Sequence, residues 1–96
     1  MTNQKLIPVI VEDKHRYVGF GYTEDPDATP IKLVNARVIT YWGTTGGVCQ
    51  LALEGPQEAT RLGSVAPKQT LREPARVYEL TDEVGQKFMD RKTYGK

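Results

Sequence analysis

The longest strand-like stretch of the chain covers residues 31–42, and it constrains the fold more than any other feature. Its β-branched and aromatic residues follow the two-residue repeat of an extended chain. The more apolar set, which we assign to the core, consists of Val34, Ala36, Val38, Thr40 and Trp42. The opposite set is mixed and consists of Leu33, Asn35, Arg37, Ile39 and Tyr41. A strand of this length needs neighbours to pair with, so the chain is predicted to build a sheet.

Shorter runs of the same type fall at residues 6–11, 17–22, 48–53 and 76–80. The first contains Pro8, which has no N–H to donate, so this strand is expected at a sheet edge or paired only beyond Pro8. The glycine-containing segment 43–47 is expected to join two of the runs as a hairpin. The predicted fold class is therefore mainly β: a small antiparallel sheet of about five or six strands, curled or sandwich-like.

One helix is predicted, at the C-terminal end of the chain over about residues 82–92. Thr81 precedes it as an N-cap, and two acidic residues follow where the helix dipole favours anions. Val84 and Phe88 are four residues apart and share one face. Gly85 weakens the helix by about 1 kcal/mol relative to Ala, so the helix is expected to form only when it is docked on the sheet.

The length of 96 residues supports one domain, residues 1–96, because two domains would each hold fewer than about 50 residues. The formal net charge of +1 argues against a protein that binds duplex nucleic acid. We expect no membrane segment, since no apolar run approaches about 20 residues. A single Cys excludes an internal disulfide and fits a reducing compartment. A thin core and an exposed strand edge favour a homo-oligomer.

The reactive side chains form no recognisable catalytic set, so we expect no enzyme activity. His15 is the sole imidazole and falls in a charged turn, whereas Cys49, the sole thiol, falls in an apolar pattern typical of a core. One His and one Cys cannot complete a tetrahedral metal site within a monomer. The acidic tip at residues 24–27 lacks the spacing of a calcium-binding loop. We therefore expect neither a metal ion nor a cofactor.

The segment 35–47 is the strongest candidate for a ligand-binding site, because it concentrates the groups that hold anions and rings. The candidate residues are Arg37, Tyr41, Trp42, Gly43, Thr44, Thr45, Gly46 and Gly47. A guanidinium pairs with phosphate, an aromatic ring stacks on a base, and glycine-rich backbone presents converging N–H groups. The spacing matches neither the phosphate-binding loop nor the dinucleotide fingerprint. The segment thus favours a small anionic, nucleotide-like ligand without identifying it.

Both parts of this segment have a purely structural interpretation. The glycines suit an ordinary hairpin turn, and Trp42 in that case fills the core. Arg37, in the middle of a strand, needs an acidic partner, solvent or a ligand. Glu79 and Glu54 are the candidate internal partners. These alternatives stay open from the sequence alone.

A longer block of residues carries a resemblance to known sequences: Asn35-Ala36-Arg37, Tyr41-Trp42, Gly43, Gln50-Leu51-Ala52 and Gly55. This block resembles a family of small, mostly uncharacterised proteins encoded by tailed bacteriophages and prophages. The resemblance covers residues 30–55 and, more loosely, residues 77–80 with the tail helix. The Thr-Thr-Gly-Gly at residues 44–47 departs from the family pattern, which is poorer in glycine there.

The resemblance implies a phage accessory protein that acts in the cytoplasm of a bacterial host. On that basis we expect a non-enzymatic binding protein that antagonises host defence by sequestering a nucleotide-like signalling molecule. One alternative is an inhibitor that binds a host protein through an interface patch formed by Tyr17, Tyr41, Tyr78 and neighbouring Arg side chains. Tyr and Arg are enriched at such interfaces. Another is a small virion or assembly component, in which an edge strand adds to a neighbouring sheet.

Overall fold

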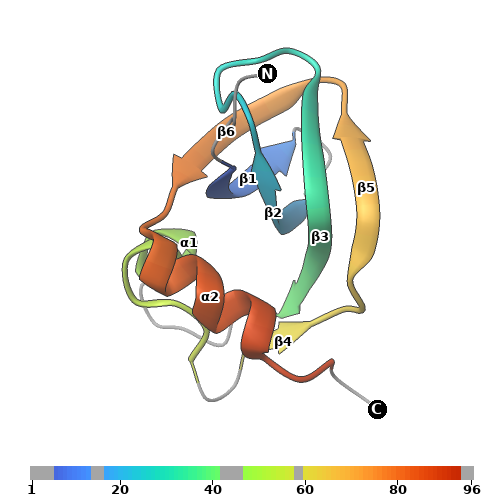
Figure 1. The fold of residues 1–96 in the computed structure, drawn as a ribbon. Helices are drawn as coiled ribbons and strands as arrows, with labels where there is room; N and C mark the ends of the chain where they lie inside the picture. Colours follow the sequence, from blue (N-terminus) through green and yellow to red (C-terminus); the bar gives the residue numbers. More distant parts are fainter. Residues whose placement is uncertain (1–5, 14–16, 42–46, 58–59, 94–96) are drawn as a thin grey trace.

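The computed structural model describes residues 6–13, 17–41, 47–57 and 60–93. The elements in chain order are β1 (Ile7–Asp13), β2 (Val18–Thr23), β3 (Ile31–Tyr41), α1 (Gly47–Glu54), β4 (Arg61–Leu62), β5 (Ala66–Leu71), β6 (Pro74–Glu79) and α2 (Asp82–Asp90) (Figure 1). The fold is mainly β with a C-terminal helix, as predicted from the strand-like runs.

The strands form one antiparallel sheet in the order β4-β3-β2-β1-β6. β4 pairs with the second half of β3, and β5 pairs with its first half. β5 and β6 follow each other along the chain but pair with strands on opposite sides of β2. The sheet must therefore curl round on itself. Figure 1 shows β5 running alongside β3 and β6 passing on the side of β1. The small antiparallel sheet predicted from the sequence is confirmed, and it is a single sheet.

The first strand is internal rather than at an edge. β1 pairs with β2 from Ile7 to Glu12 and with β6 from Val9 onward. Pro8 is accommodated because β6 ends at Glu79, so no partner on that side requires an N–H from Pro8. The Pro8 carbonyl still accepts a hydrogen bond from the Leu80 N–H at 2.9 Å. The expectation of an edge strand was wrong, while pairing with β6 does begin after Pro8.

A β-bulge in β3 overturns the predicted assignment of its faces. Val34 pairs with Tyr22 and Arg37 with Phe20, so three steps along β3 match two along β2. The extra residue is Asn35, which is exposed and has a φ of 54°. One added residue exchanges the two faces of a strand. Leu33 before the bulge and Ala36 after it therefore lie on the same face of the sheet, whereas Arg37 and Ile39 are buried on the opposite face. Val38 is 38 % exposed and Thr40 is exposed.

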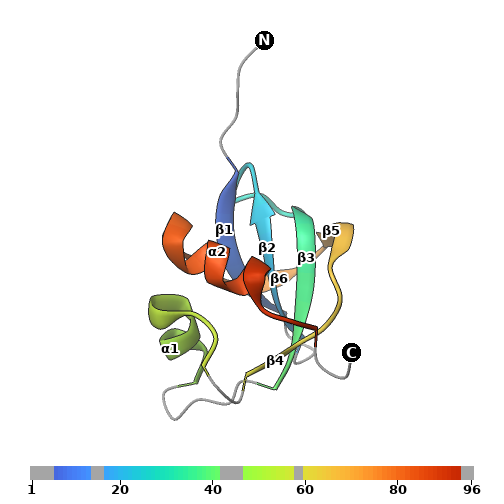
Figure 2. The ribbon, with the colours of Figure 1, turned by 60° about the horizontal axis from the view of Figure 1, so that its bottom comes forward.

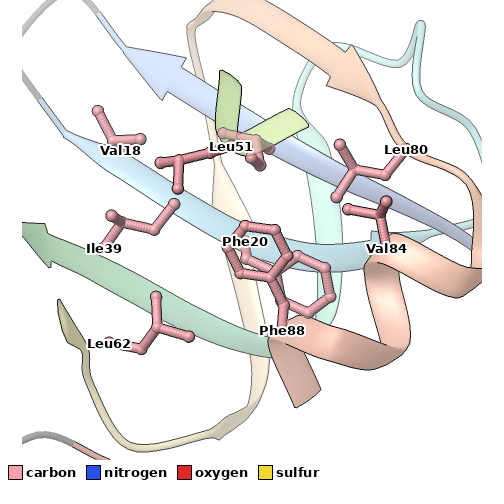
Figure 3. Close-up of a cluster of buried hydrophobic side chains, with 9 residues drawn as sticks. Val18, Phe20, Ile39, Leu51, Leu62, Leu80, Val84 and Phe88 are labelled. Carbon is pink, nitrogen blue, oxygen red and sulfur yellow. The ribbon is translucent and has the colours of Figure 1, made fainter. Parts of the chain in front are cut away.

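The apolar side chains form two clusters, one on each face of the curled sheet. The cluster under the helices contains Ile10, Val18, Phe20, Ile39, Leu51, Leu62, Leu80, Val84 and Phe88 (Figure 3). The rings of Phe20 and Phe88 stack at its centre with 4.9 Å between centroids. The second cluster, inside the curl, contains Val9, Val11, Ile31, Leu33 and Ala36. Alternate residues of β1 thus serve different clusters, which explains its unbroken apolar run.

The C-terminal helix follows the prediction closely. Thr81 is its N-cap, and the hydroxyl oxygen accepts a hydrogen bond from the Val84 N–H at 3.2 Å. α2 lies against the face of β1, β2 and β3 (Figure 2). Gly85 explains how it approaches so closely, because a Cβ there would lie 2.6 Å from the Pro8 Cβ. The helix propensity lost at Gly85 is thus offset by close packing.

The helix α1 lies where the sequence predicted a strand. Residues 48–53 were expected as a strand joined to β3 by a hairpin, but residues 47–54 are helical. Gln, Ala, Leu and Glu favour helix, and a short apolar run does not distinguish helix from strand by its period. Gly55 ends the helix with a φ of 88°, and its N–H donates to the Leu51 carbonyl at 2.8 Å. Leu51 is fully buried, so one side of α1 covers the core.

Candidate functional site

The side chain of Arg37 lies inside the protein, with only 1 % of its surface exposed. Its Nε donates to the Gly63 carbonyl at 2.9 Å. One terminal nitrogen donates to the carbonyls of Phe88 at 2.7 Å and Arg91 at 2.6 Å. The other donates to the Thr93 hydroxyl at 3.4 Å. Arg37 therefore fastens β3 to the segment after β4 and to the C-terminal end of α2.

These contacts explain how a guanidinium is buried without an acid. The last carbonyls of a helix lack intrahelical partners and carry partial negative charge, which a cation stabilises. Neither Glu79 nor Glu54 is its partner, and among the described residues no carboxylate pairs with it. Burial lowers the pKa of the Arg37 guanidinium. The expectation that Arg37 faces outward toward a ligand was wrong, because its nitrogens are used within the chain.

The other predicted site residues divide between the surface and the part of the chain that is not described. Tyr41 ends β3 and is 54 % exposed, and the Arg61 guanidinium lies over its ring at 5.3 Å from the centroid. Gly47 is the first residue of α1, with a φ of 70°. Trp42, Gly43, Thr44, Thr45 and Gly46 lie outside the described residues. Arg37 is thus buried whereas Tyr41 is exposed. The role predicted for residues 42–46 stays a prediction.

A different part of the surface contains a cavity of about 400 Å³. Its lining comes from the end of β2, the β2–β3 connection, and the paired strands β3 and β5: Thr23, Glu24, Asp25, Ala28, Pro30, Lys32, Leu33, Val34, Lys68, Gln69 and Thr70. We call it the Lys32–Lys68 cavity. Its volume lies within the range of about 300–1,000 Å³ that is usual for small-molecule sites.

Two lysines belong to this cavity because of the register between β3 and β5. Lys32 pairs with Thr70, and Val34 pairs with Lys68, so all four side chains share one face. Lys32 and Lys68 are therefore diagonal neighbours, a relationship that places Cβ atoms roughly 7–8 Å apart in a sheet. Both side chains are exposed, and among the described residues neither has a carboxylate partner. The result is two adjacent positive charges beside a hollow.

The β2–β3 connection forms another part of the lining and is ordered by local hydrogen bonds. The Asp25 N–H donates to the Thr23 hydroxyl oxygen at 3.3 Å, and Thr23 is 2 % exposed. Asp25 Oδ1 accepts a hydrogen bond from the Asp27 N–H at 3.0 Å, and the Asp25 carbonyl accepts one from the Ala28 N–H at 3.2 Å. This turn chemistry fixes the acidic edge of the cavity.

Sequence reasoning missed this cavity because it missed β5. Residues 64–71 show no clear alternation of apolar and polar side chains, so the sequence indicates only irregular or short extended pieces at residues 64–67 and 70–71. Pro67 is tolerated because β5 pairs only with β3 and thus lies at an edge. The one available signal was Lys32, a charged residue between the apolar Ile31 and Leu33. Nothing in the sequence placed Lys68 beside it.

Over the described part of the chain, no group of three or more His, Cys, Asp or Glu side chains is arranged to hold a metal ion. In the same residues no helix has both the length and the apolar character needed to cross a membrane.

The chain was compared with family models, curated proteins and solved structures. A family model described as "Domain of unknown function (DUF6948)" matches residues 6–88, which include every strand and all but the last two residues of α2. The match also covers residues 6–29, which lie outside the block of residues 30–55 singled out in the sequence. No curated protein and no solved structure matches the chain.

Proposed function

Because the chain belongs to the DUF6948 family, a domain of unknown function, we propose a function from its geometry: non-enzymatic binding of a small anionic, nucleotide-like ligand in the Lys32–Lys68 cavity. The proposal keeps the ligand class expected from the sequence but moves the site away from Arg37. The anionic group lies between the two ammonium groups, and the rest of the ligand fills the hollow beside them.

The observation that carries the proposal is the pair of neighbouring lysines without carboxylate partners among the described residues. Two like charges on adjacent strands repel each other, and a bound anion relieves that repulsion. Val34 and Pro30 give the cavity an apolar part against which a ring can pack. A few polar groups around an apolar hollow is the usual composition of a small-molecule site.

The biological setting is proposed from the resemblance to phage accessory proteins. In that setting the protein lies in the cytoplasm of a bacterial host and withholds a signalling nucleotide from a defence system. Such a role requires binding alone, so no catalytic group is needed. We also keep the prediction of a homo-oligomer, which native mass spectrometry of the purified protein measures directly.

Isothermal titration calorimetry at low ionic strength tests the proposed site. Pyrophosphate and AMP are titrated into the wild-type protein and into the variants Lys32→Gln and Lys68→Gln. Lys87→Gln is the matched control, because Lys87 is an exposed lysine on α2 and does not line the cavity. We expect binding to the wild type and the control, and affinity reduced about fivefold or more in each cavity variant.

The dependence on salt gives a second test of the same proposal. Attraction between exposed charges weakens as ionic strength rises, so the affinities of the wild-type protein for pyrophosphate and for AMP should both fall when NaCl is added. The proposal would be refuted if the wild-type protein bound neither pyrophosphate nor AMP with a dissociation constant below about 1 mM. If a host protein then copurifies with the chain, the alternative of a protein inhibitor is favoured. Tyr41 with its neighbouring Arg61 is the first interface to mutate in that case.

A further inference from the structure

The Lys32–Lys68 cavity carries charges of both signs. Lys32 and Lys68 line it from the strand pair β3–β5, and Glu24 and Asp25 line it from the connection that follows β2. A ligand that is anionic throughout would gain attraction from the lysines and suffer repulsion from these carboxylates. The charge distribution therefore selects for a ligand with two chemically different parts.

Asp25 is the acidic group best prepared to contact a ligand. The hydrogen bond from the Asp27 N–H to Oδ1 and the one from the Asp25 N–H to the buried Thr23 hydroxyl hold the residue in place. An ionised carboxylate offers about four acceptor positions on its two oxygens. The contact with Asp27 uses one of them, so capacity remains for a donor from outside the chain.

Resting on the proposed anion site, we propose that the ligand also carries an amino group, and that Asp25 accepts hydrogen bonds from it. In a nucleotide this group is an exocyclic amine of the base, with the phosphate on Lys32 and Lys68. In a smaller zwitterion it is an aliphatic ammonium group. The chemistry shared by both is an anionic end and an N–H donor end. Asp25 thereby determines specificity, whereas the lysines supply the general attraction for anions.

Matched pairs of compounds test this inference by calorimetry. GMP and IMP differ only in the 2-amino group, and AMP differs from IMP in carrying a 6-amino group in place of an oxygen. Phosphoethanolamine and ethyl phosphate form the aliphatic pair. We expect the amino member of at least one pair to bind the wild type about fivefold tighter or more, since donor recognition by a charged acceptor is worth about that factor.

Asp25→Asn is the variant that assigns this discrimination to Asp25. Asn preserves the turn, because its side-chain oxygen accepts the Asp27 N–H in the same way, but it removes the negative charge. We expect the preference for the amino member to fall to less than about twofold. Glu83→Gln, on the exposed surface of α2 and outside the cavity lining, is the control and should leave the preference unchanged.

The outcomes separate the inference from the function on which it rests. If pyrophosphate binds but no pair shows a preference, the inference is wrong and the anion site stands. A preference that persists in Asp25→Asn overturns the role of Asp25. If pyrophosphate and every other compound fail to bind the wild type, the proposed function fails, and the inference fails with it.

Discussion

The guanidinium of Arg37 donates to the backbone carbonyl of Phe88 at 2.7 Å, across 51 positions of sequence. The same nitrogen also bonds the Arg91 carbonyl at 2.6 Å, so one strand side chain satisfies the last turn of the C-terminal helix. Phe88 in turn stacks on Phe20, the residue that pairs with Arg37 across β2 and β3. Polar and apolar contacts therefore meet at one point and fix α2 on the sheet.

Arg37→Ala is expected to destabilise the fold by about 3 kcal/mol or more. The substitution leaves several carbonyls without donors, and each buried unsatisfied acceptor costs about 1–3 kcal/mol. Arg37→Lys should recover only part of this loss, because an ammonium group does not reproduce the planar fork. Urea unfolding measures the free energies. Lys92→Ala, which removes an exposed cation nearby, is the control and should change stability little. A stable Arg37→Ala protein would contradict the structural role.

The bulge at Asn35 predicts an unusual order of substitutions. With a φ of 54°, Asn35 occupies the left-handed region, which costs an ordinary residue about 1–2 kcal/mol. Asn35→Val should therefore destabilise by about that amount, although Val favours strands. Asn35→Gly should be nearly neutral, since glycine adopts this conformation freely. Thermal unfolding of the two variants distinguishes a bulge from a regular strand, in which Val would be the more stable of the two.

Gly85→Ala predicts a conflict between helix propensity and packing. Alanine gains about 1 kcal/mol of propensity in an isolated helix. In the protein its Cβ would lie 2.6 Å from the Pro8 Cβ, so α2 must move away from β1. Overpacking of this kind costs about 1–3 kcal/mol, and we expect a net loss of stability by chemical denaturation. Gln86→Ala, one residue along on the exposed side, should be neutral or slightly stabilising. A more stable Gly85→Ala variant would show that the helix packs less closely.

Because the phenol of Tyr17 is partly buried, we expect its ionisation to lower the stability of the fold at alkaline pH. Burial raises the pKa of the Tyr17 phenol above its usual value of 10.0, and the negative charge of Asp13 raises it further. The folded state therefore keeps the proton to higher pH than the unfolded state does. This contribution is complete below about pH 10 and is lost as pH rises through the folded pKa. Tyr17→Phe removes it, so the stability of this variant should fall less steeply above pH 10 than that of the wild type. Parallel slopes would contradict the prediction.

The same substitution also removes a contact within the curl of the sheet. The Tyr17 hydroxyl donates to Gln69 Oε1 at 2.7 Å, which connects the start of β2 to β5. At neutral pH we expect Tyr17→Phe to cost about 1 kcal/mol. Its ring lies over Gly19, where a Cβ would collide with it, so the glycine in β2 makes room for this bridge.

Local signals predicted the parts of the fold that depend on neighbouring residues. The N-cap at Thr81, the acidic first turn and the Val84–Phe88 spacing together specified α2, and the helix ends two residues earlier than predicted. The bulge at Asn35 was not predictable from alternation, because one residue in the left-handed conformation reverses every later position of β3. The spacing of apolar residues was equally uninformative for α1, because its apolar run is too short to distinguish a helix from a strand.

The candidate site depended on contacts that are distant in sequence. The position of Arg37 in the middle of a strand predicted that its guanidinium needs a partner. The sequence did not indicate that this partner is the backbone at the end of α2, because every residue has a carbonyl. The proximity of Lys32 and Lys68 arises only when β5 pairs with β3, and residues 66–71 show no alternation that predicts this strand. The ligand class was predicted from residues 37–47, whereas the cavity in which we propose that the ligand binds lies elsewhere on the sheet.

The location of anion binding is tested most directly by NMR. Amide chemical shifts of the ¹⁵N-labelled wild-type protein are followed while pyrophosphate is added. The proposed site predicts that the largest changes fall in residues 23–34 and 66–71, which surround the Lys32–Lys68 cavity. Changes centred on residues 41–47, or spectra that stay unchanged at millimolar pyrophosphate, would contradict it.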